Sequence, residues 1–199
     1  MGDLKYRKPA WVIDGLVETE TLGLLFGEPG CGKSFLAVDM ALCVATGVPF
    51  HERSVKQGAV FYIAGEGFNG LTRRFRAWAK HKNVEIDGAG LFVSKKAAQF
   101  LDAASAAAVT QAVRVLAAEH GIPAMIFIDT IARNFGAGDE NSTSEMGKFI
   151  AAMDALKAEF QGCSIFLIHH TGHSEKQRAR GSIALKGALD AEYRLDKSE

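Results

Sequence analysis

Short apolar runs alternate with longer segments of helical periodicity along most of the chain. The apolar runs of strand length are residues 22–26, 59–64, 91–93, 124–128 and 164–168. The longer segments with helical spacing are residues 33–46, 69–82, 103–120 and 142–160, followed by a short helix at 183–189 and a last strand at 191–195. Strands that are apolar on both faces are typical of a parallel sheet between two layers of helices. The pattern predicts an α/β fold with a mostly parallel central sheet and helices on both faces.

Two of these helices carry signals at their ends. Gly121, Ile122 and Pro123 follow the third helix, and a glycine with a proline soon after it is typical of a helix C-terminus. Ser142 or Thr143, with an acidic residue soon after, is typical of a capped helix start. We therefore expect the third helix to end before the glycine and the fourth to begin at the hydroxyl residues.

A glycine-rich loop stands between the first strand and the first helix. It reads Gly27, Glu28, Pro29, Gly30, Cys31, Gly32, Lys33, Ser34, with Phe35 directly after it. Chance produces this G-x-x-x-x-G-K-S spacing somewhere in such a chain roughly 1–2% of the time. Glycines let the backbone N–H groups turn inward and form an anion site at a helix N-terminus. We expect these nine residues to bind ATP, with Lys33 at the β- and γ-phosphates and Ser34 on Mg²⁺.

Two acidic residues follow neighbouring apolar strands. Asp129 ends the run 125–129 and is expected to hold Mg²⁺ through water. Thr130 follows it, where many hydrolysing P-loop proteins carry a glutamate. A base must then come from elsewhere, and Glu66, in a glycine-flanked turn after the strand 59–64, is the best candidate to orient the attacking water. The alternative for Glu66 is a solvated residue of a turn.

Paired histidines follow the strand 164–168. His169 and His170 stand where a polar side chain can contact the γ-phosphate, and we expect one to face the site while the other packs. Two adjacent imidazoles can also bind a metal, but no cysteine or carboxylate stands at ligand spacing, so zinc is not expected.

Taken together, these motifs resemble the RecA-like ATPases and, within them, the RepA-like replicative helicases of plasmids and phages. The resemblance covers about residues 11 to 196 and rests on segments 27–34, 64–66, 128–132, 169–171, 180–186 and 191–196. It implies a RecA-like P-loop core that forms a hexameric ring or filament with ATP at subunit interfaces. It also implies that Glu66 activates water and that His170 senses the γ-phosphate.

The resemblance further implies an arginine that completes a neighbour's site. Arg194, on the last strand, is the preferred candidate, Arg180 is the second and Lys186 is the weakest. Relatives continue with more strands, whereas this sequence stops at Glu199. We therefore expect residues 1–199 to form a single RecA-like domain that is either trimmed or naturally short.

Composition narrows the partners of the protein. The 23 basic and 23 acidic residues balance, so any contact with nucleic acid must come from local patches. Three cysteines, an odd and sparse set, favour reduced thiols in a cytoplasmic protein. No apolar run approaches the roughly 18 residues that a membrane span needs.

Two polar loops are candidates for binding single-stranded DNA. Residues 133–144 are rich in glycine, and residues 171–180 carry basic side chains. Long loops in compact domains are usually functional, and basic loops suit contacts with a single-stranded backbone. The basic residues between 73 and 82 are instead expected on the solvated face of a helix.

The leading hypothesis is a nucleic-acid-dependent ATPase, the motor of a replicative helicase. A small-molecule kinase can use the same scaffold, but it needs an arginine-rich lid, for which residues 177–180 are the nearest match. Glu66 and the paired histidines also have no clear role in the mechanism of a kinase. A nucleotide-binding switch without catalysis is the third hypothesis.

Overall fold

The computed structural model describes residues 8–65, 67–172 and 177–197. Its centre is a six-stranded sheet in the order β5-β4-β6-β7-β3-β8, in which all neighbouring strands are parallel. The strands are β3 (Leu22–Gly27), β4 (Val60–Ala64), β5 (Leu91–Val93), β6 (Met125–Asp129), β7 (Ser164–His170) and β8 (Ala191–Leu195). The expected α/β fold with a parallel sheet is confirmed.

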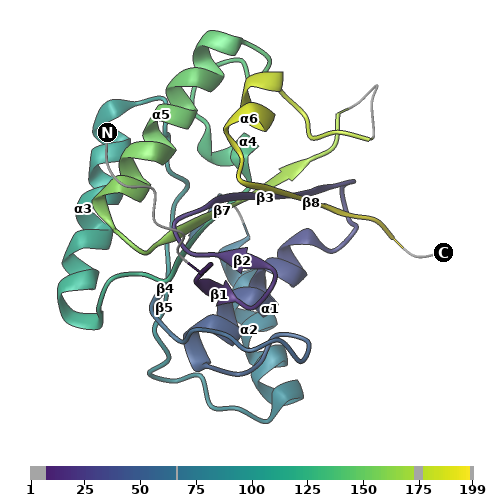
Figure 1. Ribbon diagram of the computed structural model, residues 1–199, viewed down its shortest axis with the longest axis vertical. Coiled ribbons are helices and arrows are strands. Elements are labelled where there is room, and N and C mark those ends of the chain that lie inside the picture. The colour runs from purple at the N-terminus through teal and green to yellow at the C-terminus, as the bar shows by residue number, and fades with distance from the viewer. Residues whose placement is uncertain (1–7, 66, 173–176, 198–199) are drawn as a thin grey trace.

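Helices cover both faces of the sheet (Figure 1). One face carries α1 (Lys33–Thr46), α2 (Phe68–Lys82) and a hairpin of β1 (Trp11–Ile13) and β2 (Val17–Glu18), and the other carries α3 (Ala103–His120), α4 (Ile131–Asn134), α5 (Thr143–Glu159) and α6 (Ile183–Ala188). Successive strand residues enter the two cores in turn: Tyr62 lies in the core under α1, whereas Phe61 and Ile63 lie in the core under α5. None of the described helices is long and apolar enough to cross a bilayer.

The helix ends follow the signals in the sequence. α1 and α3 have the expected bounds, and Gly121 ends α3 with its N–H donating to the Ala117 carbonyl at 3.0 Å. Ser142 caps α5, because its hydroxyl accepts the N–H of Glu145 at 3.4 Å. These short-range predictions are confirmed because each depends on residues within one helical turn.

Two expectations about local structure are wrong. β7 does not end at residue 168 but includes both histidines, because His169 pairs with Phe26 and His170 with Gly27 of β3. The expected loop 133–144 begins inside α4, where the Asn134 side chain donates to the Thr130 carbonyl at 2.9 Å. The β1–β2 hairpin was not expected, since its short strands have no pattern of their own; they pair with each other, and Ile13 pairs with Val55.

The carboxyl ends of the strands meet at one edge of the sheet. Gly27 lies beside His170, and Ala64 lies beside Asp129. The chain leaves β3 through α1 and enters β4 on the far side of β7 and β6. Because the connection after β3 crosses β7 and β6, it leaves a crevice at the carboxyl edge of the sheet. Ligands bind at this edge in open α/β sheets.

Candidate nucleotide-binding site

The glycine-rich loop connects β3 to α1 at this edge. Gly30 and Gly32 have φ angles of +77° and +102°, which favour glycine, and Gly32 is the residue before α1. Gly27 is close to β8: a Cβ there would lie 2.4 Å from the carbonyl oxygen of Leu195. The loop therefore has the conformation that a phosphate-binding loop needs, and glycine is required at three of its positions.

Lys33, the first residue of α1, is held inside this loop. Its side chain is 5% exposed, and its ammonium group donates to the carbonyl oxygens of Gly27 at 2.9 Å and of Glu28 at 2.8 Å. Burial lowers the pKa of Lys33, while its electrostatic interactions with Cys31 and Asp129 act to raise that pKa. A nearly buried cation with neutral carbonyl partners is suited to binding an anion.

A buried tyrosine orients the carboxylate of Asp129. The Tyr62 hydroxyl donates to Asp129 Oδ2 at 2.6 Å, and the pairing of β4 with β6 places the two residues on adjacent strands. Burial, followed by the charge of Asp129, raises the pKa of Tyr62 well above its usual value, so the hydroxyl remains a donor at neutral pH. Sequence reasoning missed Tyr62, because its role depends on the register between two strands.

Seven of the fourteen expected site residues come together around one cavity of about 400 Å³. Its wall consists of Gly30, Gly32, Lys33, Ser34 and Phe35 from the loop and α1, Asp129, Thr130 and His170 from β6 and β7, and Gly67, Gly70, Leu71 and Arg74 from the α2 side. Gly27, Glu28, Pro29 and Cys31 belong to the same loop but do not line the cavity, and Cys31 Sγ lies 3.8 Å from Lys33 Nζ. The donor set fits a nucleotide phosphate, and Ser34 with Asp129 fits Mg²⁺.

The two histidines have different environments, as the sequence predicts. His170 lines the cavity, whereas the side chain of His169 is 0% exposed. Burial lowers the pKa of His169 to about 3, and electrostatic interactions with His170 and Arg180 act in the same direction. His169 is therefore neutral at physiological pH, and His170 is the member of the pair that lines the cavity.

Arg74 is a cavity residue that sequence reasoning missed. Its guanidinium carbon lies 4.2 Å above the ring centroid of Phe35, whose side chain is 61% exposed. Assigning every basic residue of α2 to solvent is wrong for Arg74, because its side chain lines the cavity. The signal was its spacing, because Arg74 stands three residues after Leu71 and four before Trp78, which are both buried.

The three candidates for a residue acting on a neighbour lie elsewhere. Arg194 contacts Asp196 at 2.9 Å and Gln177 at 2.5 Å. Arg180 Nε lies 3.0 Å from a carboxylate oxygen of Glu140, and Lys186 Nζ lies 3.6 Å from Glu192. None of these three residues is among the described residues that line the nucleotide cavity. Their role in a neighbour's site stays a prediction.

Glu66 lies outside the described residues, so its role also stays a prediction. The glycines on either side of it are described. The N–H of Gly65 donates to the carbonyl oxygen of Asp129 at 2.6 Å, and Gly67 lines the cavity. A Cβ at Gly65 would lie 2.2 Å from Cβ of Arg133, so β4 can approach α4 this closely only with glycine at that position.

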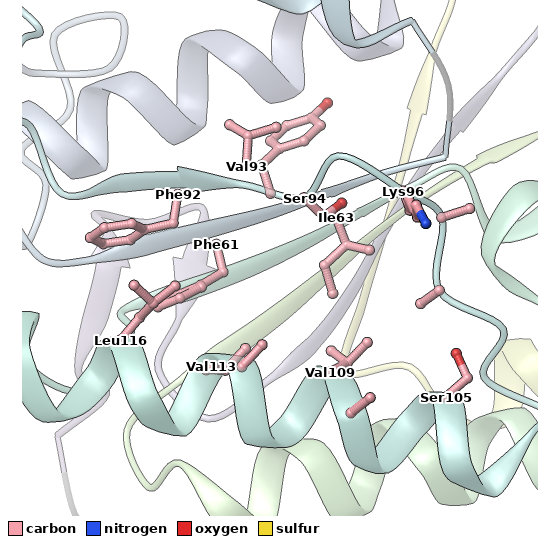
Figure 2. A pocket seen from close by; sticks show the side chains of 15 residues that line it. Phe61, Ile63, Phe92, Val93, Ser94, Lys96, Ser105, Val109, Val113 and Leu116 are labelled. Carbon is pink, nitrogen blue, oxygen red and sulfur yellow. The ribbon is translucent and has the colours of Figure 1, made fainter.

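A second cavity, of about 430 Å³, lies between the edge of the sheet and α3 (Figure 2). Figure 2 shows Phe61 and Phe92 from the strands opposite Val109, Val113 and Leu116 from α3. Its described lining is mostly apolar and includes none of the residues expected to bind nucleotide. It is separate from the site at the carboxyl edge.

The comparison with known families agrees with this geometry. The AAA domain family matches residues 3–176, which include the phosphate loop, Asp129 and both histidines. The matched segment thus covers most of the chain and every part of the cavity wall. The chain therefore belongs to the AAA domain family, a family of P-loop ATPases with a RecA-like core.

Proposed function

We propose that this chain is the ATP-hydrolysing motor domain of a RecA/RepA-like DNA helicase, which hydrolyses ATP with Mg²⁺ and couples hydrolysis to single-stranded DNA. One observation carries the proposal: the buried ammonium group of Lys33 and the buried carboxylate of Asp129 line the same cavity at the carboxyl edge of the sheet. One group suits a phosphate and the other suits the cation that accompanies it.

Each group in the cavity has a defined task in this reaction. The ammonium group of Lys33 exchanges its loop carbonyls for phosphate oxygens, and the N-terminus of α1 adds its dipole. Ser34 and Asp129 would hold Mg²⁺, and the ion would neutralise charge on the phosphates. Tyr62 fixes the direction of the Asp129 carboxylate. His170 contacts the terminal phosphate and responds to its loss.

Glu66 is the proposed general base. Thr130, the residue after Asp129, has no group that can accept a proton at neutral pH. Glu66 follows β4, whose last residue Ala64 pairs with Asp129. A carboxylate at this edge of the sheet can orient a water molecule for attack on the γ-phosphate.

The loops after β6 and β7 support the coupling to DNA. Residues 135–142 follow α4, and the segment up to Arg180 follows His170, so both start at the carboxyl edge beside the cavity. The two described ends of the segment after β7 are joined by pairing of Thr171 with Ala179. This docked arrangement favours a sensing loop over the freely closing lid of a small-molecule kinase.

The test is phosphate release from ATP, measured with and without a single-stranded DNA oligonucleotide. The wild-type protein should hydrolyse ATP, and DNA should raise the rate. Glu66→Gln should bind ATP normally and lower hydrolysis roughly 10²-fold or more, whereas the exposed control Glu85→Gln should behave as wild type. A rate that DNA does not change contradicts the helicase assignment, and normal turnover of Glu66→Gln contradicts the assigned base.

A further inference from the structure

Glu140 is a buried carboxylate that belongs to none of the motifs of the nucleotide site. It lies in the loop between α4 and α5 and is 7% exposed. Acidic residues are almost never this buried without a partner, because an ionised carboxylate loses its hydration. Its partners therefore indicate what the residue does.

The charged partner of Glu140 is Arg180, in the segment 177–182 before α6. Arg180 Nε lies 3.0 Å from Glu140 Oε2, and the same oxygen lies 3.7 Å from Nε2 of His169. The imidazole of His169 is neutral at physiological pH, so its contact is a close approach without charge pairing. One carboxylate oxygen thus stands between the buried histidine and the arginine.

The backbone joins the same two segments. The carbonyl oxygen of Glu140 accepts the N–H of Ser182 at 2.8 Å, and the hydroxyls of Thr143 and Ser182 lie 3.1 Å apart. Gly181, with φ of +96°, leaves room for this contact, since a Cβ there would lie 3.0 Å from that carbonyl oxygen. The loop before α5 and the segment entering α6 are therefore docked together at Glu140.

A continuous series of hydrogen bonds links this contact to the phosphate loop. The N–H of Arg180 donates to the carbonyl oxygen of His170 at 2.9 Å. The next residue, Thr171, donates its N–H to the carbonyl oxygen of Gly27 at 3.2 Å. That oxygen also accepts the ammonium group of Lys33 at 2.9 Å. The carbonyl oxygen of Gly27 is therefore shared by Lys33 and Thr171.

We propose that Glu140 is a positioning residue that couples the phosphate end of the nucleotide site to the loops 135–142 and 177–182. By holding Arg180, it keeps the segment 177–182 in contact with the backbone of His170, so that a change at the terminal phosphate reaches both loops together. This inference rests on the proposed ATPase function, because the coupling starts at the phosphate loop. It adds to that function the element through which the site and the loops act on each other.

The test compares the wild type with Glu140→Gln, which keeps the shape and removes the charge, and with Asp139→Asn, an exposed neighbour that loses the same charge. Hydrogen–deuterium exchange is measured with and without a non-hydrolysable ATP analogue and Mg²⁺. The informative peptides cover residues 27–34, 135–146 and 177–185. Proximity alone does not demonstrate coupling. Coupling is demonstrated if removal of the Glu140 charge changes how nucleotide binding affects exchange in the distant loops.

In the wild type and in Asp139→Asn, nucleotide should slow exchange in all three peptides. In Glu140→Gln, protection should remain at 27–34 and be lost at the other two, while kcat falls roughly 2- to 30-fold with an unchanged KM. Equal protection of all three peptides in Glu140→Gln overturns the proposal. Protection in the wild type at 27–34 alone overturns it as well. A wild type with no protection at 27–34 contradicts the proposed nucleotide site itself and removes the starting point of the coupling.

Discussion

At the scale of single residues, the site depends on groups that are fixed before any ligand arrives. Lys33 and Asp129 could be predicted from the sequence, because each belongs to a motif with fixed spacing beside a strand. The roles of Tyr62 and Arg74 could not, because one depends on strand register and the other on how α2 packs. The sequence therefore predicts the phosphate contacts better than the groups that orient them.

Replacing Tyr62 by phenylalanine should weaken the response to Mg²⁺. The substitution removes the hydrogen bond to Asp129 Oδ2 and leaves the carboxylate free to rotate. Hydrogen bonds to charged groups are worth enough that the Mg²⁺ concentration for half-maximal ATP hydrolysis should rise roughly tenfold. Tyr193→Phe is the control, because that hydroxyl donates to Leu16 at the edge of the sheet. Identical Mg²⁺ titrations for the wild type and Tyr62→Phe contradict the orienting role.

His169 should make the folded state sensitive to mild acid. Its pKa is about 3 in the folded state and near 6.5 when unfolded, so the unfolded state binds more protons between these values. Stability is therefore lost as pH falls below about 6.5, by roughly 1 kcal/mol between pH 7 and 5.5. Urea unfolding at the two pH values measures this loss. His169→Gln should reduce the pH dependence, whereas the exposed control His81→Gln should not; equal dependence in His169→Gln contradicts the account.

At the scale of elements, α2 shows where sequence patterns stop being informative. Its periodicity predicted a helix that begins at residue 69, and the structure begins it at Phe68. The pattern could not show that the part of α2 with Leu71 and Arg74 lines a cavity, because a cavity depends on the elements that pack around it. The helix α4 was also missed, because its last two residues begin a polar and glycine-rich segment that predicts a loop.

Arg74→Gln should lower affinity for ATP roughly tenfold, the effect expected for one charge-assisted contact with a phosphate. Its guanidinium group lines the cavity and rests on the ring of Phe35, from which it can move to a nucleotide. Arg76→Gln, on the exposed face of the same helix, is the matched control and should bind ATP as the wild type does. Calorimetric titration with ATP and ADP provides the measurement. If both variants bind ATP with the same affinity, Arg74 does not contact the nucleotide.

At the scale of the whole molecule, the sequence predicted the fold well because strongly apolar strands leave few alternatives to a parallel sheet. Assembly could not be read in the same way, since it depends on surfaces and on a second copy of the chain. β8 is one edge of the sheet and carries Arg194, whose exposed side chain contacts Asp196 and Gln177 within its own subunit. A single domain and a ring or filament both stay predictions.

If Arg194 completes a neighbour's site, activity should depend on association. Specific ATPase activity should rise with protein concentration, because a positive group near the γ-phosphate that a partner supplies adds a factor of about 10³ or more. Arg194→Ala should be inactive alone and regain activity when mixed with Lys33→Ala, which keeps its arginine. Activity per subunit that is flat across the dilution range, with no rescue on mixing, indicates a self-contained monomeric ATPase.

The central claim is that the loop around Lys33 binds the phosphates of ATP for hydrolysis, and Lys33→Ala tests it most directly. The measurement is ATP binding by calorimetry together with phosphate release, compared with the exposed control Lys80→Ala. Lys33→Ala should abolish hydrolysis and strongly weaken binding, because the phosphates lose the nearly buried cation that faces them. Near-normal turnover in Lys33→Ala would contradict the assignment of the site.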